Sequence, residues 1–446
     1  MLLPGIALTL LALFSQFFAV IIPSKNRICT NITILLSTLV LFIVPKIPYL
    51  SANVNIMSIV IIFTIVSMII YRDYSALSGE ELKFEFVTLT LLSTVGILIA
   101  ILAQNFLLLF CSMELTALTS YVLAGFKLSD IKSSEGALKY FILGSLVSCL
   151  SLFGISFIYG FGGSLQFKDI LYQLNNTFPA NIGLVIGIVL FLSSIFFKLS
   201  AVPLHFWTPD VYEGSPIASV TYFTAASKIG MLAILLNISK FIIGDYQPIS
   251  YNLIKIIAIL SMIIGSIGAI RQNSLKRLMA YSTILNIGYV LIGVILHTQK
   301  GADAALLYML IYAASSIGFF ICLIMLLGKD TDKASFDNIQ GIAENHKVIA
   351  AVISIIMFSM IGIPPLTGFF GKYYLFYQAI NQGEFFLAFL GIFTSVIAAF
   401  YYLKVIKTVY FVEKTEIVKL PMQYGLLLIN SLVVGFLVFG SFFLSF

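Results

Sequence analysis

Four charged residues interrupt long apolar runs of this sequence and could carry protons through a membrane. They are three lysines and one glutamate, namely Lys198, Lys228, Lys372 and Glu114. A charge inside lipid is costly, and ionisable residues kept there usually serve a function. Burial favours the neutral amine of a lysine, whereas a nearby carboxylate favours the ammonium. These residue types therefore indicate a group of proton carriers.

The four residues lie at similar depths in their apolar segments. Glu114 lies ten residues after Gln104 and thirteen before Lys127, or about 15 Å and about 20 Å along a helix. Lys228 is twelve residues from both Pro216 and Lys240, which places it near mid-membrane. Lys372 lies about 13 Å from the expected outer end of its segment. A common depth favours a shared proton relay.

Prolines accompany two of the lysines. Lys198 lies inside an apolar run that starts near Ile182 and is followed five residues later by Pro203, and Lys372 follows the Pro364-Pro365 pair. Proline removes a backbone donor and clashes with the preceding turn, so both helices should break. Backbone freed at membrane depth persists only against protein or water. The sequence predicts two broken helices with a lysine beside each break.

Each charged residue also has a structural alternative. Lys228 could snorkel to the membrane surface, and Glu114 could form a static salt bridge between helices. Lys198 and Lys372 could cap carbonyl groups freed by the breaks. These alternatives do not explain why all four residues share one depth.

Two further residues near the first break were considered. His205 lies just beyond Pro203, where it is either a possible relay residue or an interfacial histidine. Trp207 and the tyrosines at segment ends are typical of the aromatic belt at a membrane surface.

The composition indicates an all-α polytopic membrane protein. The chain has 446 residues, of which 60% are hydrophobic and 10% are charged, against about 25% charged residues in soluble domains. The long apolar runs do not show the short alternating pattern of a β-barrel. Hydropathy predicts about fourteen membrane-spanning helices, with an exposed loop at 161–181 that has room for a short surface helix. Their expected limits are 2–22, 31–49, 54–72, 84–103, 105–126, 136–160, 182–212, 216–240, 250–271, 277–297, 302–328, 347–381, 384–411 and 421–445.

The two breaks suggest an internal repeat. They fall in the seventh and twelfth predicted spans, and an odd offset of five spans inverts the second copy. We therefore expect two inverted five-helix repeats. The corresponding domains are 1–83 (helices 1 to 3), 84–240 (first repeat), 250–411 (second repeat) and 412–446 (helix 14).

Loop charges predict the orientation. Of the 25 Lys and Arg residues, 17 fall in one set of connections and 5 in the other, and the remaining three are the intramembrane lysines. Positive charge collects on the cytoplasmic side, so both termini are expected on the outer side. The first 22 residues lack Lys and Arg, unlike the basic start of a signal peptide, and we expect a retained first span.

Several classes of function are disfavoured. The four cysteines are scattered without a Cys-x-x-Cys pair, so neither a metal nor an iron–sulfur site is indicated. The sequence has no dinucleotide-binding glycine motif after a strand and no basic patch typical of nucleic-acid binding. We expect no cofactor in this chain.

The motifs around the charged residues resemble one family, subunit N of the proton-pumping NADH:quinone oxidoreductase (respiratory complex I). In that family the implied proton relay is a glutamate on span 5 and lysines on spans 7, 8 and 12, which correspond to the four charged residues above. Asn286 departs from the pattern, because a histidine is expected there. The matching segments are Glu114-Leu115, Lys198-Leu199-Ser200 with Pro203, Trp207 to Gly214, Ala226-Ser227-Lys228, Asn273 with Lys276-Arg277-Leu278, Tyr281-Ser282 and Gly362-Ile363-Pro364 leading to Gly371-Lys372.

The resemblance implies a proton-translocating subunit of a bacterial inner membrane. NADH, FMN, the iron–sulfur clusters and quinone would then bind to partner subunits, both membrane-embedded and peripheral. One alternative is a subunit of a multisubunit cation/proton antiporter, which shares this machinery, and another is a membrane scaffold without transport. The Thr208 to Gly214 segment and Lys372, where some relatives carry glutamate, favour the complex I family.

Overall fold

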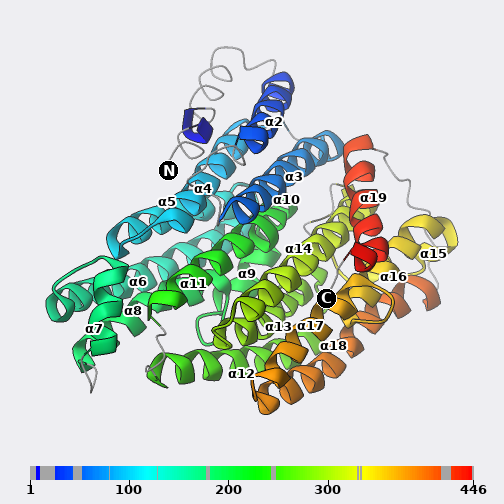
Figure 1. The fold of residues 1–446 in the computed structure, drawn as a ribbon. Helices are drawn as coiled ribbons and strands as arrows, with labels where there is room; N and C mark the ends of the chain where they lie inside the picture. Colours follow the sequence, from blue (N-terminus) through cyan, green and yellow to red (C-terminus); the bar gives the residue numbers. More distant parts are fainter. Residues whose placement is uncertain are drawn as a thin grey trace. The chain divides into compact units, whose positions relative to one another are not determined.

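The computed structural model is helical in the part of the chain that it describes (Figure 1). That part comprises residues 7–10, 26–43, 53–79, 81–127, 129–176, 181–242, 248–328, 331, 334–412 and 423–443. Within these ranges, eleven helical segments are long and apolar enough to cross a membrane. The predicted all-α membrane fold is thereby confirmed, whereas the number fourteen and the inverted repeats stay predictions.

The helices follow the predicted spans with shifts at their ends. The first predicted span, 2–22, falls almost wholly outside the described residues, and span 182–212 is divided between α8 and α9. The elements are α2 (Asn26–Ile43), α3 (Val54–Ser78), α4 (Glu85–Leu102), α5 (Phe106–Ala124), α6 (Ile131–Gly162), α7 (Phe167–Asn176), α8 (Ile182–Leu199), α9 (Trp207–Gly214), α10 (Ile217–Tyr222), the π-helical turn η4 (Phe223–Ser227), α11 (Lys228–Ile242), α12 (Pro248–Ile270), α13 (Leu275–Ile295), α14 (Gln299–Leu327), the short turn η6 (Asp337–Ile339), α15 (Ile342–Asn345), α16 (Lys347–Ile361), α17 (Thr367–Asn381), α18 (Phe385–Phe411), α19 (Tyr424–Phe439) and η7 (Gly440–Phe443).

Some basic residues expected in connections lie inside helices. Helix α3 continues to Ser78 and so includes Arg72, and α6 begins at Ile131 and so includes Lys132 and Lys139. Ion pairs make these positions tolerable, because Arg72 contacts Asp73 at 2.8 Å and Lys139 contacts Glu135 at 2.7 Å. Hydropathy alone places a helix end at the first charge, although paired charges can extend a helix beyond the apolar core.

Polar residues define where several helices begin. Asn105 accepts a hydrogen bond from the backbone of Leu108 and caps the start of α5, which separates α5 from α4. Asp130 and Asn181 cap α6 and α8 in the same way. Such caps satisfy backbone donors that have no partner within the helix.

The chain divides into two compact units. The first comprises Met1–Met68, Leu82–Trp207 and Gly214–Ile256, and the second comprises Ile69–Glu81, Thr208–Glu213 and Ile257–Phe446. The first unit therefore holds Glu114, Lys198 and Lys228, and the second holds Lys372.

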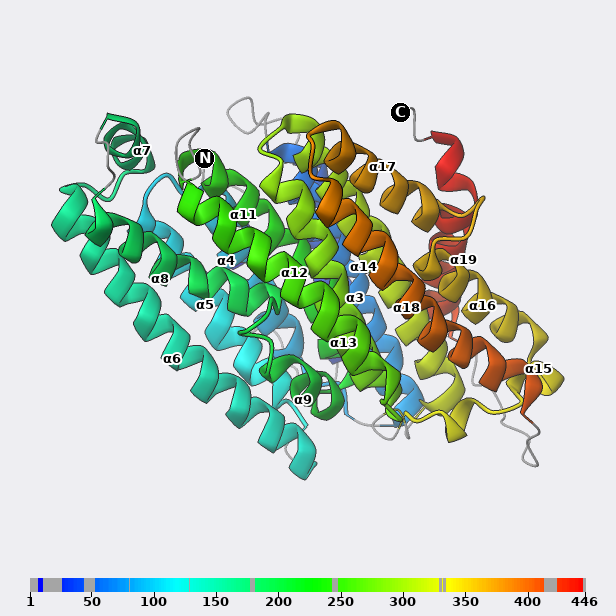
Figure 2. The same ribbon diagram turned by 90° about the horizontal axis from the view of Figure 1, so that it is seen from below.

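Helices α6 and α8 of the first unit run side by side (Figures 1 and 2). Two glycines face each other where these helices meet. A Cβ atom at Gly154 would come within 2.6 Å of the Gly187 carbonyl oxygen, and one at Gly187 within 2.9 Å of the Gly154 carbonyl oxygen. Small residues allow membrane helices to approach closely, where van der Waals packing replaces the hydrophobic effect.

We expect Gly154→Leu to separate α6 from α8 and to lower the midpoint of thermal unfolding of the detergent-solubilised protein. Overpacking of this kind costs about 1–3 kcal/mol. Gly160→Leu on the same helix is the matched control, because a Cβ there meets no atom within 4 Å. Equal midpoints for the two variants would contradict a close contact at Gly154.

Candidate functional site

The first break begins with a left-handed residue. Helix α8 ends at Leu199, and Ser200 has a φ of 66°. The amide of Ala201 donates to the Phe196 carbonyl at 2.9 Å, which is the pattern of a Schellman cap. Pro203 follows and prevents the helix from resuming in register.

The second break has the same local geometry. Helix α16 ends at Ile361, and Gly362 has a φ of 91°. The amide of Ile363 donates to the Phe358 carbonyl at 3.1 Å, and the Pro364-Pro365 pair follows. In both units, therefore, a left-handed cap ends the helix and proline comes after it.

Lys228 closes the first break from a neighbouring helix segment. Its Nζ donates to the Lys198 carbonyl and to the Ser200 hydroxyl, each at 2.6 Å, and the side chain is fully buried. The Trp207 ring centroid lies 5.1 Å from Nζ, a cation–π contact. The π-helical turn η4 directly precedes Lys228, and such turns often occur at functional sites. Snorkelling is excluded as an explanation for Lys228.

The side chain of Lys198 points away from its own helix end. Its Nζ donates to the carbonyl of Met113 on α5, the residue before Glu114. Ser148 of α6 donates to Glu114 Oε1 at 2.6 Å. Among the described residues, neither Lys198 nor Glu114 takes part in an ion pair. The structure thus brings both to one location without joining them in the static salt bridge considered above.

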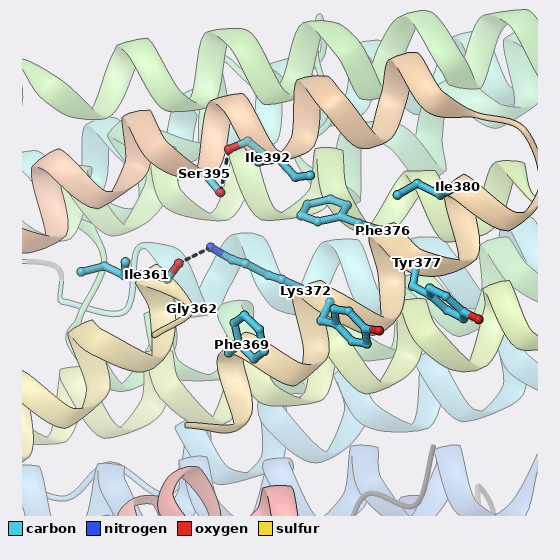
Figure 3. Close-up of a pocket in the computed structure, with 10 residues that line it drawn as sticks. Ile361, Gly362, Phe369, Lys372, Phe376, Tyr377, Ile380, Ile392 and Ser395 are labelled. Carbon is cyan, nitrogen blue, oxygen red and sulfur yellow. Dashed lines mark hydrogen bonds between the residues drawn. The ribbon is translucent and has the colours of Figure 1, made fainter. Parts of the chain in front are cut away.

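Lys372 occupies the second break. Its Nζ donates to the Met360 and Ile361 carbonyls at 2.9 and 3.0 Å, as Figure 3 shows for Ile361. The Tyr289 ring centroid lies 5.7 Å from Nζ. No carboxylate of the described residues forms an ion pair with it.

Lysine side chains do cap the carbonyl groups at both helix breaks, but one of the two lysines is not the one expected from the sequence. We expected Lys198 and Lys372 to cap the freed carbonyls. In the structure Lys372 does so at α16, but at α8 the cap is Lys228, and Lys198 reaches another helix instead. The sequence could not reveal this exchange, because it depends on which neighbouring helix faces the break.

Trp207 was assigned to the membrane-surface belt, and that prediction is wrong. The side chain is 2% exposed, its indole N–H donates to the Phe197 carbonyl at 2.9 Å, and its ring stacks on Tyr140 with centroids 4.2 Å apart. Trp207 therefore supplies one wall of the Lys228 site. His205 is also buried, with its ring 4.6 Å from that of Phe206, and within the described residues no hydrogen bond joins it to Lys198 or Lys228.

Asn286 lies in a network of buried hydroxyl groups in the second unit. Its Nδ2 donates to the Ser282 carbonyl at 2.7 Å. A carbonyl only accepts, so this contact fixes the orientation of the amide. Its Oδ1 must then accept from the Tyr308 hydroxyl at 2.5 Å. Ser282 and Tyr402 share a further hydrogen bond of 2.6 Å. Sequence reasoning identified Asn286 only as a departure and missed this network.

A cluster of charges holds part of α9 against α13. Arg277 Nη1 contacts Asp210 Oδ1 at 2.7 Å and Glu213 Oε2 at 3.1 Å, and Lys276 Nζ donates to the Glu213 carbonyl at 3.3 Å. The Arg277 pairs are partly exposed, and such pairs contribute at most about 1 kcal/mol each. Their role is positional, because they orient the helix that follows the first break.

No metal centre is indicated by the described residues, since they contain no group of three or more His, Cys, Asp or Glu side chains that could hold an ion.

Comparisons with known proteins agree with the motifs. The family described as "NADH:quinone oxidoreductase/Mrp antiporter, TM" matches residues 103–398. The fold is similar to a chain of respiratory complex I from Thermus thermophilus, with a TM-score of 0.81 and 23% identity over 98% of this chain and 97% of that chain. It is also similar to a chain of the Mrp complex from Dietzia, with a TM-score of 0.79 and 21% identity over 93% and 82% of the two chains. The two structures establish the fold without separating the two classes of function.

Sequence identity separates the two classes. The NADH-quinone oxidoreductase subunit N of Rickettsia felis is 76% identical over 456 aligned residues that cover 100% of both chains. The chain therefore belongs to the subunit N family of the NADH-quinone oxidoreductases.

Proposed function

We propose that this chain is a proton-translocating membrane subunit of NADH:quinone oxidoreductase and has no redox centre of its own. The main support is Lys228, whose fully buried amine is held by one carbonyl and one hydroxyl. A structural scaffold would be more stable with apolar residues in place of buried charges. The chain would span the bacterial inner membrane, with both termini outside as the loop charges indicate.

The redox chemistry belongs to other subunits in this proposal. Partner subunits in the membrane and in the peripheral part of the complex would bind NADH, FMN, the iron–sulfur clusters and quinone. This chain would couple to them by moving protons.

In the first unit, Glu114 would control the proton on Lys198. Lys198 Nζ already contacts the residue next to Glu114, and Ser148 holds the carboxylate in the present arrangement. When Glu114 approaches, the ammonium form of Lys198 is favoured. When Glu114 withdraws, burial favours the neutral amine, and the proton can pass through water to Lys228, which contacts the Lys198 backbone.

In the second unit, Lys372 would be the last group to bind the proton. It belongs to α17, its Nζ contacts the last carbonyls of α16, and the break between the two helices would allow small hinge motions. Three ammonium groups and one carboxylate would leave uncompensated charge in the membrane, so at least one lysine must be neutral at any time. The lysines would therefore take the proton in sequence.

The second candidate function is a cation/proton antiporter subunit, because the chain shares its fold with a chain of the Mrp complex. Purification from native membranes tests this directly. A complex that contains flavin and iron–sulfur clusters supports the proposed function, and a complex without them supports the antiporter.

Lys228→Ala should lower NADH-driven proton pumping, because it removes a titrating group at a central position. Lys228→Arg should also impair pumping, since arginine keeps its proton in this pH range. The measurement is acidification by membrane vesicles with matched content of the complex. An arginine variant that pumps like the wild type would leave Lys228 with a capping role only.

Glu114 and Lys198 should be energetically coupled. A double-mutant cycle with Glu114→Gln and Lys198→Met, read out as pumping rate, should show clear non-additivity, as expected for groups that interact. Purely additive losses would show that the two residues act independently and would remove the switch at Glu114.

Lys372→Glu should retain more pumping than Lys372→Met, because a carboxylate can still alternate between charged and neutral forms. The comparison needs membranes in which both variants assemble to the same extent. Equal pumping by the two variants would show that titration at this position is unnecessary and that Lys372 only caps α16.

A further inference from the structure

A narrow pocket of about 370 Å³ lies between α17 and α18, beside the end of α16 (Figure 3). One wall is a ladder of aromatic rings at successive turns of α17. The centroids of Phe369 and Tyr373 lie 6.1 Å apart, and those of Tyr373 and Tyr377 lie 5.8 Å apart, with interplanar angles of 16° in both pairs. The three rings are therefore nearly parallel along one side of α17.

The pocket is elongated and open on one side. It reaches from Phe369 to Ile380 along α17, or about 16 Å at 1.5 Å per residue. Ile380 and Ile392 at its mouth are 42% and 49% exposed. A pocket of this shape fits an extended hydrocarbon chain better than a compact ring system.

The pocket has one charged group, Lys372, at the end nearest Gly362. Two of its three N–H donors bind the α16 carbonyls. Among the described residues no carboxylate pairs with it, which leaves one donor available for an anion. The other polar groups of the lining are the hydroxyl of Ser395, which donates to the Ile392 carbonyl at 2.8 Å, and the hydroxyls of Tyr373 and Tyr377. Lys372 is thus the single cation among the lining residues.

We propose that this pocket binds a long-chain free fatty acid, with its carboxylate on Lys372 and its chain along the ladder of Phe369, Tyr373 and Tyr377. The single positive charge of Lys372 then matches the single negative charge of the carboxylate. A phospholipid would place a phosphodiester and two ester groups against a lining that supplies one cation and the hydroxyls of Tyr373 and Tyr377, and buried polar groups without partners are costly.

The proton balance of binding is neutral. A fatty acid in lipid arrives as the neutral acid, and its O–H transfers the proton to the neutral amine of Lys372. The products are a carboxylate and an ammonium group, so no net charge enters the membrane. If the proposed proton relay is correct, the bound acid holds Lys372 in its ammonium form and slows pumping, whereas binding itself does not depend on the relay.

The test uses the intact purified complex in phosphatidylcholine vesicles with a palmitic acid analogue that carries a photoreactive diazirine near the chain end. We expect cross-links to peptides that contain Tyr377, Ile380 or Ile392. Excess oleic acid should abolish them, and methyl oleate should not. Lys372→Met should lower the cross-link yield about tenfold, the factor expected from a hydrogen bond to a charged group.

A second pair of variants leaves Lys372 intact. Ile392→Trp should fill the pocket and abolish labelling, whereas Val396→Trp, an exposed position on the same helix that is not part of the lining, should not. A carboxylate site is overturned if the Lys372→Met variant is labelled as strongly as the wild type, or if methyl oleate competes as well as oleic acid. If phosphatidylglycerol competes as well as oleic acid, the pocket binds a phospholipid and not a fatty acid. Labelling that requires removal of neighbouring subunits would assign the pocket to a partner helix. If the fatty acid labels the pocket and pumping does not slow, the proposed role of Lys372 in the relay is contradicted, whereas the binding site stands.

Discussion

The carbonyl groups at the ends of two interrupted helices are the constraint on which both sites depend. Within a membrane these carbonyls cannot be hydrated by lipid, and an unsatisfied group costs several kcal/mol. Lys228 satisfies the carbonyl of Lys198, and Lys372 satisfies those of Met360 and Ile361. Each helix end is thus stabilised by a side chain that can also give up a proton.

This double role has a structural consequence at the first break. Ser200 adopts a left-handed conformation with a φ of 66°, where the second break uses Gly362. A left-handed non-glycine residue stores strain of order 1–3 kcal/mol. Serine occupies this left-handed position in place of glycine because its hydroxyl accepts a hydrogen bond from Lys228 Nζ at 2.6 Å. The strain is therefore retained at a position where glycine could not bind the ammonium.

Much of the fold and part of the site could be predicted from the sequence. Hydropathy located most helices, and proline located the two interruptions, because both are local properties of the chain. The partner of each lysine could not be predicted. The pairing of Lys228 with α8, the burial of Trp207 and the π-helical turn before Lys228 all arise from contacts between segments distant in sequence. Ser148 was missed for the same reason, since nothing near it in sequence indicates Glu114.

The fixed amide of Asn286 determines what the surrounding hydroxyl groups can do. A chain of hydroxyls passes a proton by having every O–H reverse its direction. An amide cannot take part in such a reversal, because its nitrogen only donates and its oxygen only accepts. The amide therefore joins Tyr308 and Ser282 by hydrogen bonds, but a proton cannot pass between them through it. With asparagine in this place, the second unit has a fixed polar link at Asn286, and hydroxyl-to-hydroxyl transfer is interrupted at that one residue.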